Sequence, residues 1–108
     1  MDWKKVVAII RGNKLREVEE RLKDLQVGGI SVTRGAGYGE YANLLSQDWF
    51  VTHARLEIYC EASRAEVIVQ AIMDEAHTGT AGDGIVVVIP VERMYRIKTK
   101  AEEKPEIS

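Results

Sequence analysis

The sequence has few of the residues that cross-link secreted proteins or break up disordered ones. It contains one cysteine, Cys60, and two prolines among 108 residues. A lone cysteine cannot form an internal disulfide, and the scarcity of proline argues against a disordered or low-complexity chain. The first apolar run, residues 6–10, is too short for a signal peptide or a membrane span. We therefore expect a globular, single-domain protein in the cytoplasm, without direct membrane insertion.

The sequence also lacks a strong excess of charge of either sign. Lys and Arg together number 15 and Asp and Glu 17, for a formal net charge of -2 at pH 7. Because binding to a nucleic-acid backbone needs a basic excess, nucleic acid is not an expected partner. A metal site is not expected either, since His53 and His77 have no third ligand at a characteristic spacing. No serine or cysteine stands in a recognisable catalytic signature.

The apolar residues that are present predict a regular order of strands and helices. Four apolar or alternating segments predict strands, and two stripes at intervals of three and four predict amphipathic helices. Asn13 and Ser63 are the predicted helix caps. The strands are expected at residues 6–10, 30–33, 53–60 and 85–91, and the helices at residues 15–25 and 65–77. This order matches the βαββαβ arrangement of ferredoxin-like domains, so we predict an α+β sandwich.

Two of the predicted strands indicate that the chain assembles with itself. Residues 6–10 and 85–89 are apolar at every position rather than at alternate ones. With both helices on one face of the sheet, the opposite face would still be apolar. We expect other copies of the chain to cover that face.

Two glycine clusters are candidate anion-binding loops. Residues 79–84 contain three glycines, and residues 35–39 contain three at every second position. Clustered glycines let backbone N–H groups converge on an anion, although a connector that needs glycine only for its turns would look the same. The second cluster opens a long segment without periodicity, in which Trp49 and Phe50 are either anchors for a partner or residues buried by the loop itself.

The end of the chain carries two basic residues that suit a phosphate. Arg96 and Lys98 lie two apart on a segment predicted to be extended, which places both side chains on one side. A solvated edge strand protected by basic residues is the alternative. Residues 100–108 are predicted to be a polar, flexible tail.

A series of short motifs then stands in the order found in a known family. The chain resembles the P-II signal-transduction family from about Lys4 to Thr99. The resemblance is carried by Ala8-Ile9-Ile10-Arg11, Ser31-Val32-Thr33, Gly37-Tyr38-Gly39, Leu56-Glu57-Ile58, Ala76-His77-Thr78-Gly79, Gly82-Asp83-Gly84 and Tyr95-Arg96-Ile97-Lys98-Thr99.

The resemblance implies a domain at residues 1–99 that forms a compact homotrimer and binds adenine nucleotides in clefts between subunits. The family's T-loop would be residues 38–52 and its B-loop residues 78–84. The implied nucleotide-binding residues are Ile9, Ser31, Gly37, Tyr38, Gly39, Tyr59, Gly82, Asp83, Gly84, Arg96 and Lys98. The implied effector and T-loop residues are Glu40, Tyr41, Trp49, Phe50, His53 and Arg55.

Departures from the family's pattern indicate which nucleotide and which effector to expect. Ile85 stands where nitrogen-sensing members have a lysine for the distal phosphates, and Glu40 stands where they have a basic residue. Two lost cations and an added carboxylate disfavour ATP, so ADP or AMP is the expected nucleotide, with ATP a weaker ligand. His53 stands where those members have a lysine that would help hold 2-oxoglutarate. Family members with altered T-loops look like regulators of other transport systems, including inorganic-carbon uptake, so the resemblance makes bicarbonate a candidate second effector. The candidate anion contacts are Arg34, Arg55 and the backbone of residues 37–39.

The expected function is regulatory and not enzymatic. Nucleotide binding would order the T-loop, which would then dock on a target such as a membrane transporter or a metabolic enzyme. A nitrogen-status sensor that responds to 2-oxoglutarate is one alternative. Others are a small nucleotide hydrolase, in which Asp83 or Glu57 orients water and Arg96 stabilises charge, and a structural trimer without a ligand.

Overall fold

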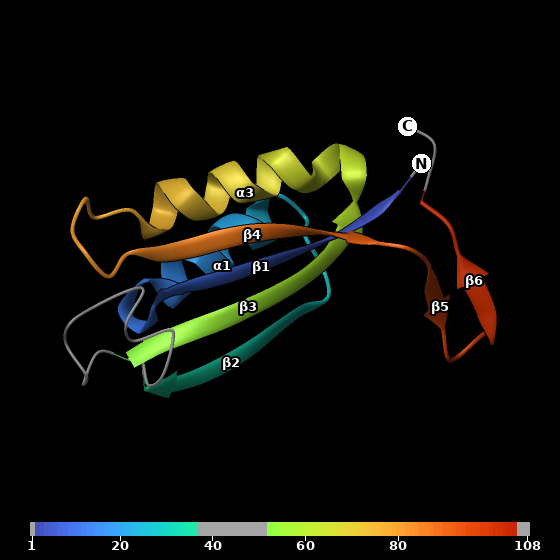
Figure 1. The fold of residues 1–108 in the computed structure, drawn as a ribbon, viewed down its shortest axis with the longest axis horizontal. Coiled ribbons are helices and arrows are strands. Elements are labelled where there is room, and N and C mark those ends of the chain that lie inside the picture. Colours follow the sequence, from blue (N-terminus) through green and yellow to red (C-terminus); the bar gives the residue numbers. More distant parts are fainter. Residues whose placement is uncertain (1, 37–51, 106–108) are drawn as a thin grey trace.

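The computed structural model describes residues 2–36 and 52–105. Four strands form one antiparallel sheet in the order β2-β3-β1-β4, and two helices pack on it (Figure 1). The predicted ferredoxin-like α+β fold is therefore confirmed. The elements of this sandwich are β1 (Trp3–Arg11), the 3-10 helix η1 (Gly12–Lys14), α1 (Leu15–Asp24), β2 (Ile30–Ala36), β3 (Thr52–Glu61), α3 (Ala62–Ala76) and β4 (Gly84–Val91).

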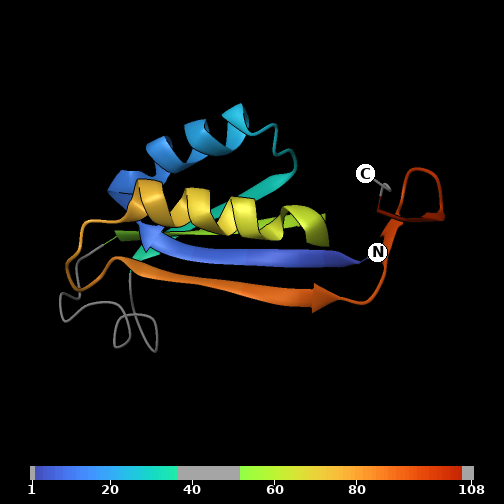
Figure 2. The ribbon, with the colours of Figure 1, turned by 90° about the horizontal axis from the view of Figure 1, so that it is seen from above.

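The core lies between the sheet and its two helices, which cover the same face (Figure 2). Alternate residues of the central strands point into it, as the two-residue period of a strand requires. The helices contribute the residues of their apolar stripes. The fully buried large side chains are Val6, Ile10, Val18, Leu22, Leu56, Ile58, Ile68 and Ile72.

The opposite face of the sheet carries the apolar surface expected from the sequence. Residues of β4 on this face expose about two-fifths of their surface: Ile85, Val87 and Ile89 are 40, 40 and 41% exposed. They lie beside β1, with Ile85 opposite Ile9. A shallow hollow of about 190 Å³ lies on this part of the face.

Helix ends differ from the sequence-based expectation. Asn13 lies inside η1, and Ser63 lies inside α3, whose N-cap is Glu61; neither α1 nor α3 has a side-chain cap hydrogen bond. At α3, the chain runs from β3 into the helix without a loop, and Ala62 N donates to Asp2 O at 2.8 Å. This tertiary contact with the start of the chain thus satisfies one of the four N–H groups at the helix start that have no partner within the helix.

The C-terminal segment forms a hairpin of β5 (Met94–Arg96) and β6 (Ala101–Glu103). The prediction of a loose tail from Lys100 onward is wrong over β6, because Trp3 Nε1 donates a 2.8 Å hydrogen bond to Glu103 O and anchors that strand. Figures 1 and 2 both show the hairpin projecting at one end of the sheet, while the loop between α3 and β4 lies at the other. In the part of the chain that the structure describes, no helix is long and apolar enough to cross a membrane.

Candidate functional site

The loop that connects α3 to β4 is built on glycines in a backbone conformation that side chains rarely adopt. Gly79, Gly82 and Gly84 have φ angles of 86°, 97° and 110°. The positive φ angle therefore explains why glycine occupies each of these three positions. These turns fold the loop around one carboxylate.

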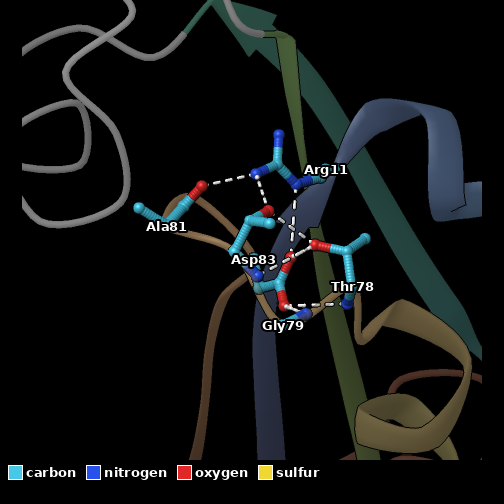
Figure 3. A network of polar contacts seen from close by, with 6 residues as sticks. Arg11, Thr78, Gly79, Ala81 and Asp83 are labelled. Carbon is cyan, nitrogen blue, oxygen red and sulfur yellow. Dashed lines mark hydrogen bonds and ion pairs between the residues drawn. The ribbon is translucent and has the colours of Figure 1, made fainter.

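Asp83 is the centre of the loop (Figure 3). Its Oδ2 accepts hydrogen bonds from the backbone N–H groups of Thr78 and Gly79, both at 2.8 Å, and its Oδ1 accepts one from the Thr78 hydroxyl. Arg11 Nε donates to the same Oδ1 at 3.3 Å. The hydrogen bonds from Thr78, then from Gly79 and Arg11, hold the pKa of the Asp83 carboxyl far below its usual range. These contacts therefore favour the ionised form of the Asp83 carboxyl.

Arg11 joins the end of β1 to this loop. Besides Asp83, it contacts Thr80 Oγ1 at 3.1 Å and the carbonyl oxygen of Ala81, both through Nη2. Arg11 is not among the site residues predicted from the sequence. The predicted topology could have indicated it, because β1 and β4 are neighbours in a βαββαβ sheet. Arg11 follows the last core residue of β1 and so lies next to the loop that leads into β4.

The arrangement is an anion-binding loop that holds a carboxylate of its own chain. Backbone N–H groups and a guanidinium converge on Asp83 as they would on a phosphate. Asp83 thus acts through its side chain by shaping the loop. The backbone N–H groups of Gly82, Asp83 and Gly84 stay the predicted phosphate donors.

The structure brings Ile9 and Gly84 into direct contact. A side chain at Gly84 would begin 1.8 Å from the carbonyl oxygen of Ile9. These two implied nucleotide-binding residues therefore belong to one end of the site, beside the loop. Only glycine permits this approach.

Other implied residues lie further along the open face of the sheet. Ser31 on β2 is opposite Glu57, and Tyr59 on β3 is opposite Lys5. Glu57 Oε1 lies 3.0 Å from Arg55 Nη2 and 3.6 Å from Lys5 Nζ, and that ammonium lies 5.6 Å from the centre of the Tyr59 ring. This polar half of the face adjoins the apolar half on β1 and β4.

The predicted anion contacts Arg34 and Arg55 do not meet. Arg34 is opposite Ala54, whose side chain faces the helices, whereas Arg55 lies on the open face and pairs with Glu57. A strand places successive side chains on opposite faces, which separates these two positions.

His53 is the buried polar residue at the loop end of the sheet. It lies opposite Arg11 in the register of β1 and β3 and is 6% exposed. Neither of its ring nitrogens has a hydrogen-bond partner. An imidazole and a guanidinium therefore occupy neighbouring positions on β3 and β1, at the end of the sheet next to the Asp83 loop.

Arg96 and Lys98 lie on the C-terminal hairpin, but not on one extended segment as predicted. β5 ends at Arg96, and Lys98 belongs to the turn that leads to Lys100, whose φ is 56°. The hairpin that carries both cations lies at the opposite end of the sheet from the loop between α3 and β4 (Figure 1).

Several predicted site residues lie outside the described ranges, which are residues 2–36 and 52–105. These residues are Gly37, Tyr38, Gly39, Glu40, Tyr41, Trp49 and Phe50.

Within the described ranges, no group of three His, Cys, Asp or Glu side chains could hold a metal ion.

The fold and the loop define a class: a ferredoxin-like α+β domain with an anion-binding loop and an apolar open sheet face. Residues 3–101 match the family described as nitrogen regulatory protein P-II. The chain belongs to the P-II family of regulatory signal-transduction proteins.

Individual relatives cover nearly the whole chain. Nitrogen regulatory protein P-II of Azospirillum brasilense is 38% identical over 103 residues, which is 89% of this chain and 92% of the relative. The protein of the same name from Pasteurella multocida is 34% identical and covers 96% of this chain and 99% of its own. The solved structure of Arabidopsis thaliana PII bound to citrate superposes with a TM-score of 0.79 at 28% identity, covering 95% of this chain and 90% of that chain.

Proposed function

We propose that this protein is a P-II regulator that binds ADP or AMP between copies of its own chain and controls a target protein through residues 38–52. The observation that carries the proposal is the separation of the Asp83 loop from the hairpin with Arg96 and Lys98 (Figures 1 and 2). A phosphate site that uses both parts needs the loop of one copy and the hairpin of another.

The open face of the sheet supports assembly into a compact homotrimer. It presents an apolar strip along β1 and β4 that water would otherwise cover. The hairpin adds Tyr95 and Ile97, which are 62 and 93% exposed. A neighbouring copy that buries these surfaces also brings the hairpin to a loop.

Complementation between two inactive variants tests the shared site. Asp83→Ala spoils the loop and Arg96→Ala spoils the hairpin, so each variant alone should bind ADP at least about tenfold more weakly than the wild type. After the two variants are unfolded together and refolded, about a quarter of the sites should combine an intact loop with an intact hairpin. Calorimetry with ADP measures the recovered fraction.

A mixture of Arg96→Ala with Lys98→Ala is the matched control, because both changes lie on the same hairpin and no combination restores it. Recovery in the first mixture and none in the control is the expected result. The mixed assemblies of Asp83→Ala and Arg96→Ala contain chains with an intact loop and chains with an intact hairpin. If they do not recover ADP binding, the loop and hairpin of different copies do not share a site.

The preference for ADP or AMP follows from the residue that comes directly after the loop, in β4. Ile85 is apolar and 40% exposed, and it supplies no charge to a distal phosphate. A charge-assisted contact would contribute about 1.5–3 kcal/mol, and without it the desolvation of the third phosphate is not compensated. ATP should therefore bind at least about tenfold more weakly than ADP. Calorimetric titration of the wild type with AMP, ADP and ATP measures the order. ATP binding more tightly than both would contradict the proposed preference.

Bicarbonate is the proposed second effector, and a nitrogen-status sensor that responds to 2-oxoglutarate is the alternative. Arg11 and His53 are side by side in the register at the loop end of the sheet, which supports a small anion there. The citrate bound by Arabidopsis thaliana PII supports an anionic effector in general. The same ADP titrations, repeated with saturating bicarbonate or 2-oxoglutarate, distinguish the two, because a coupled effector must shift the ADP affinity.

The hydrolase alternative needs Asp83 or Glu57 to orient a water molecule. Both carboxylate oxygens of Asp83 already accept hydrogen bonds, from Thr78, Gly79 and Arg11. Glu57 contacts Arg55 and Lys5 through Oε1. Because a general base needs an oxygen within hydrogen-bond reach of water, the contacts of Asp83 argue against this residue in that role and support a regulator over an enzyme.

A further inference from the structure

The C-terminal hairpin pairs its own arginine with a carboxylate. Arg96 on β5 donates from Nη2 to Glu103 Oε2 on β6. Arg96 is opposite Ala101, and Met94 is opposite Glu103, so Arg96 and Glu103 are diagonal neighbours on one face of the hairpin. Their side chains are 58 and 38% exposed, which leaves both within reach of a ligand.

The position of Glu103 is fixed independently of this ion pair. Trp3 Nε1 donates its hydrogen bond to the backbone carbonyl of Glu103, not to the carboxylate. The anchor between β1 and β6 therefore survives a change of the side chain at position 103. The carboxylate is held beside Arg96 by the register of the hairpin.

We infer that Glu103 is a specificity-determining residue that limits how many phosphates the site accepts. The inference rests on the proposed function, in which Arg96 meets the phosphates of the nucleotide. Nη2 is a terminal nitrogen of the guanidinium and a natural contact for a phosphate oxygen. A phosphate that approaches Nη2 must displace the Glu103 carboxylate or share the arginine with it.

The charge of the ligand decides how strongly Glu103 opposes it. The negative charge of the nucleotide rises from AMP to ADP to ATP, and repulsion from a fixed carboxylate rises with it. Because both partners are partly exposed, solvent screens the effect to that of a surface ion pair. Glu103 and the apolar Ile85 then act in the same direction, against the triphosphate.

The test is the affinity of Glu103→Gln for AMP, ADP and ATP, measured by calorimetry at low ionic strength. The variant should bind ATP about 2- to 5-fold more tightly than the wild type, with a smaller gain for ADP and the smallest for AMP. The gain should shrink as salt is added. Glu102→Gln is the matched control, because Glu102 is opposite Tyr95 on the other face of the hairpin and its loss removes the same formal charge.

The outcomes separate this inference from the proposed function. Glu103 does not select the number of phosphates if Glu103→Gln and Glu102→Gln change the ratio of ATP to AMP affinity equally. The same holds if Glu103→Gln raises the affinity for all three nucleotides by one factor. In both cases the proposed nucleotide site is unaffected. If neither the wild type nor Glu103→Gln binds any of the three, both the proposed function and the inference are overturned.

Discussion

Gly84→Ala should lower the free energy of unfolding by at least about 3 kcal/mol. The new Cβ would lie 1.8 Å from the carbonyl oxygen of Ile9, and the φ of 110° at this position is one that alanine avoids. The chain can relieve the contact only by moving the start of β4 away from β1, which opens the sheet next to the Asp83 loop. Chemical denaturation followed by circular dichroism measures the loss.

Gly28→Ala is the control for Gly84→Ala. Nothing lies within 4 Å of a side chain at Gly28, and its φ is not positive. Its unfolding free energy should change by no more than about 1 kcal/mol, and a small gain is expected because alanine restricts the unfolded chain. Equal losses from both substitutions would mean that the contact between Gly84 and Ile9 is not what makes Gly84 necessary.

Asp83→Ala should weaken ADP binding by more than about tenfold while the sheet and helices remain folded. The substitution leaves the N–H groups of Thr78 and Gly79 and the guanidinium of Arg11 without their shared acceptor. A loop that has lost its organising anion must be ordered again when the nucleotide binds, and that ordering reduces affinity. Calorimetry gives the affinity, and thermal unfolding shows that the domain is intact.

Asp74→Ala removes the same charge from an exposed position on α3, where Asp74 accepts a hydrogen bond from Gln70. Its ADP affinity should stay within about twofold of the wild type, because the lost charge is exposed and screened by solvent. Asp83→Asn keeps the size of the side chain and should fall between the wild type and Asp83→Ala. Wild-type affinity in Asp83→Ala would show that the nucleotide does not use the loop in this shape.

The apolar patterning of the sequence was enough to predict the fold and the apolar open face of the sheet. Residues 6–10 and 85–89 are apolar at consecutive positions, and the period of a strand turns that pattern into a sheet with two apolar faces. The helices cover one face in the structure, and the other remains apolar and exposed on β4. Local periodicity is visible in a sequence because it depends on neighbouring residues.

The nucleotide-binding residues expected from the sequence stay a prediction, but the structure shows how their segments lie. Local composition indicated the glycine loop at residues 79–84 and the basic pair Arg96 and Lys98, but not the hairpin that carries this pair. Arg34 and Arg55 were grouped although they lie on opposite faces, and Arg96 and Lys98 were placed on one strand although β5 ends at Arg96. Composition is a local property, whereas strand register decides which side chains meet.

The sequence by itself determined the class of fold, the glycine loop and the apolar surface on the open face of the sheet. Only the tertiary structure decided that Arg11 joins Asp83 across 72 positions, that Arg96 is paired with Glu103, and that loop and hairpin lie at opposite ends. Ion pairs and hydrogen bonds act over a few ångströms, so they depend on strand order and register, which bring together residues that are distant in the chain.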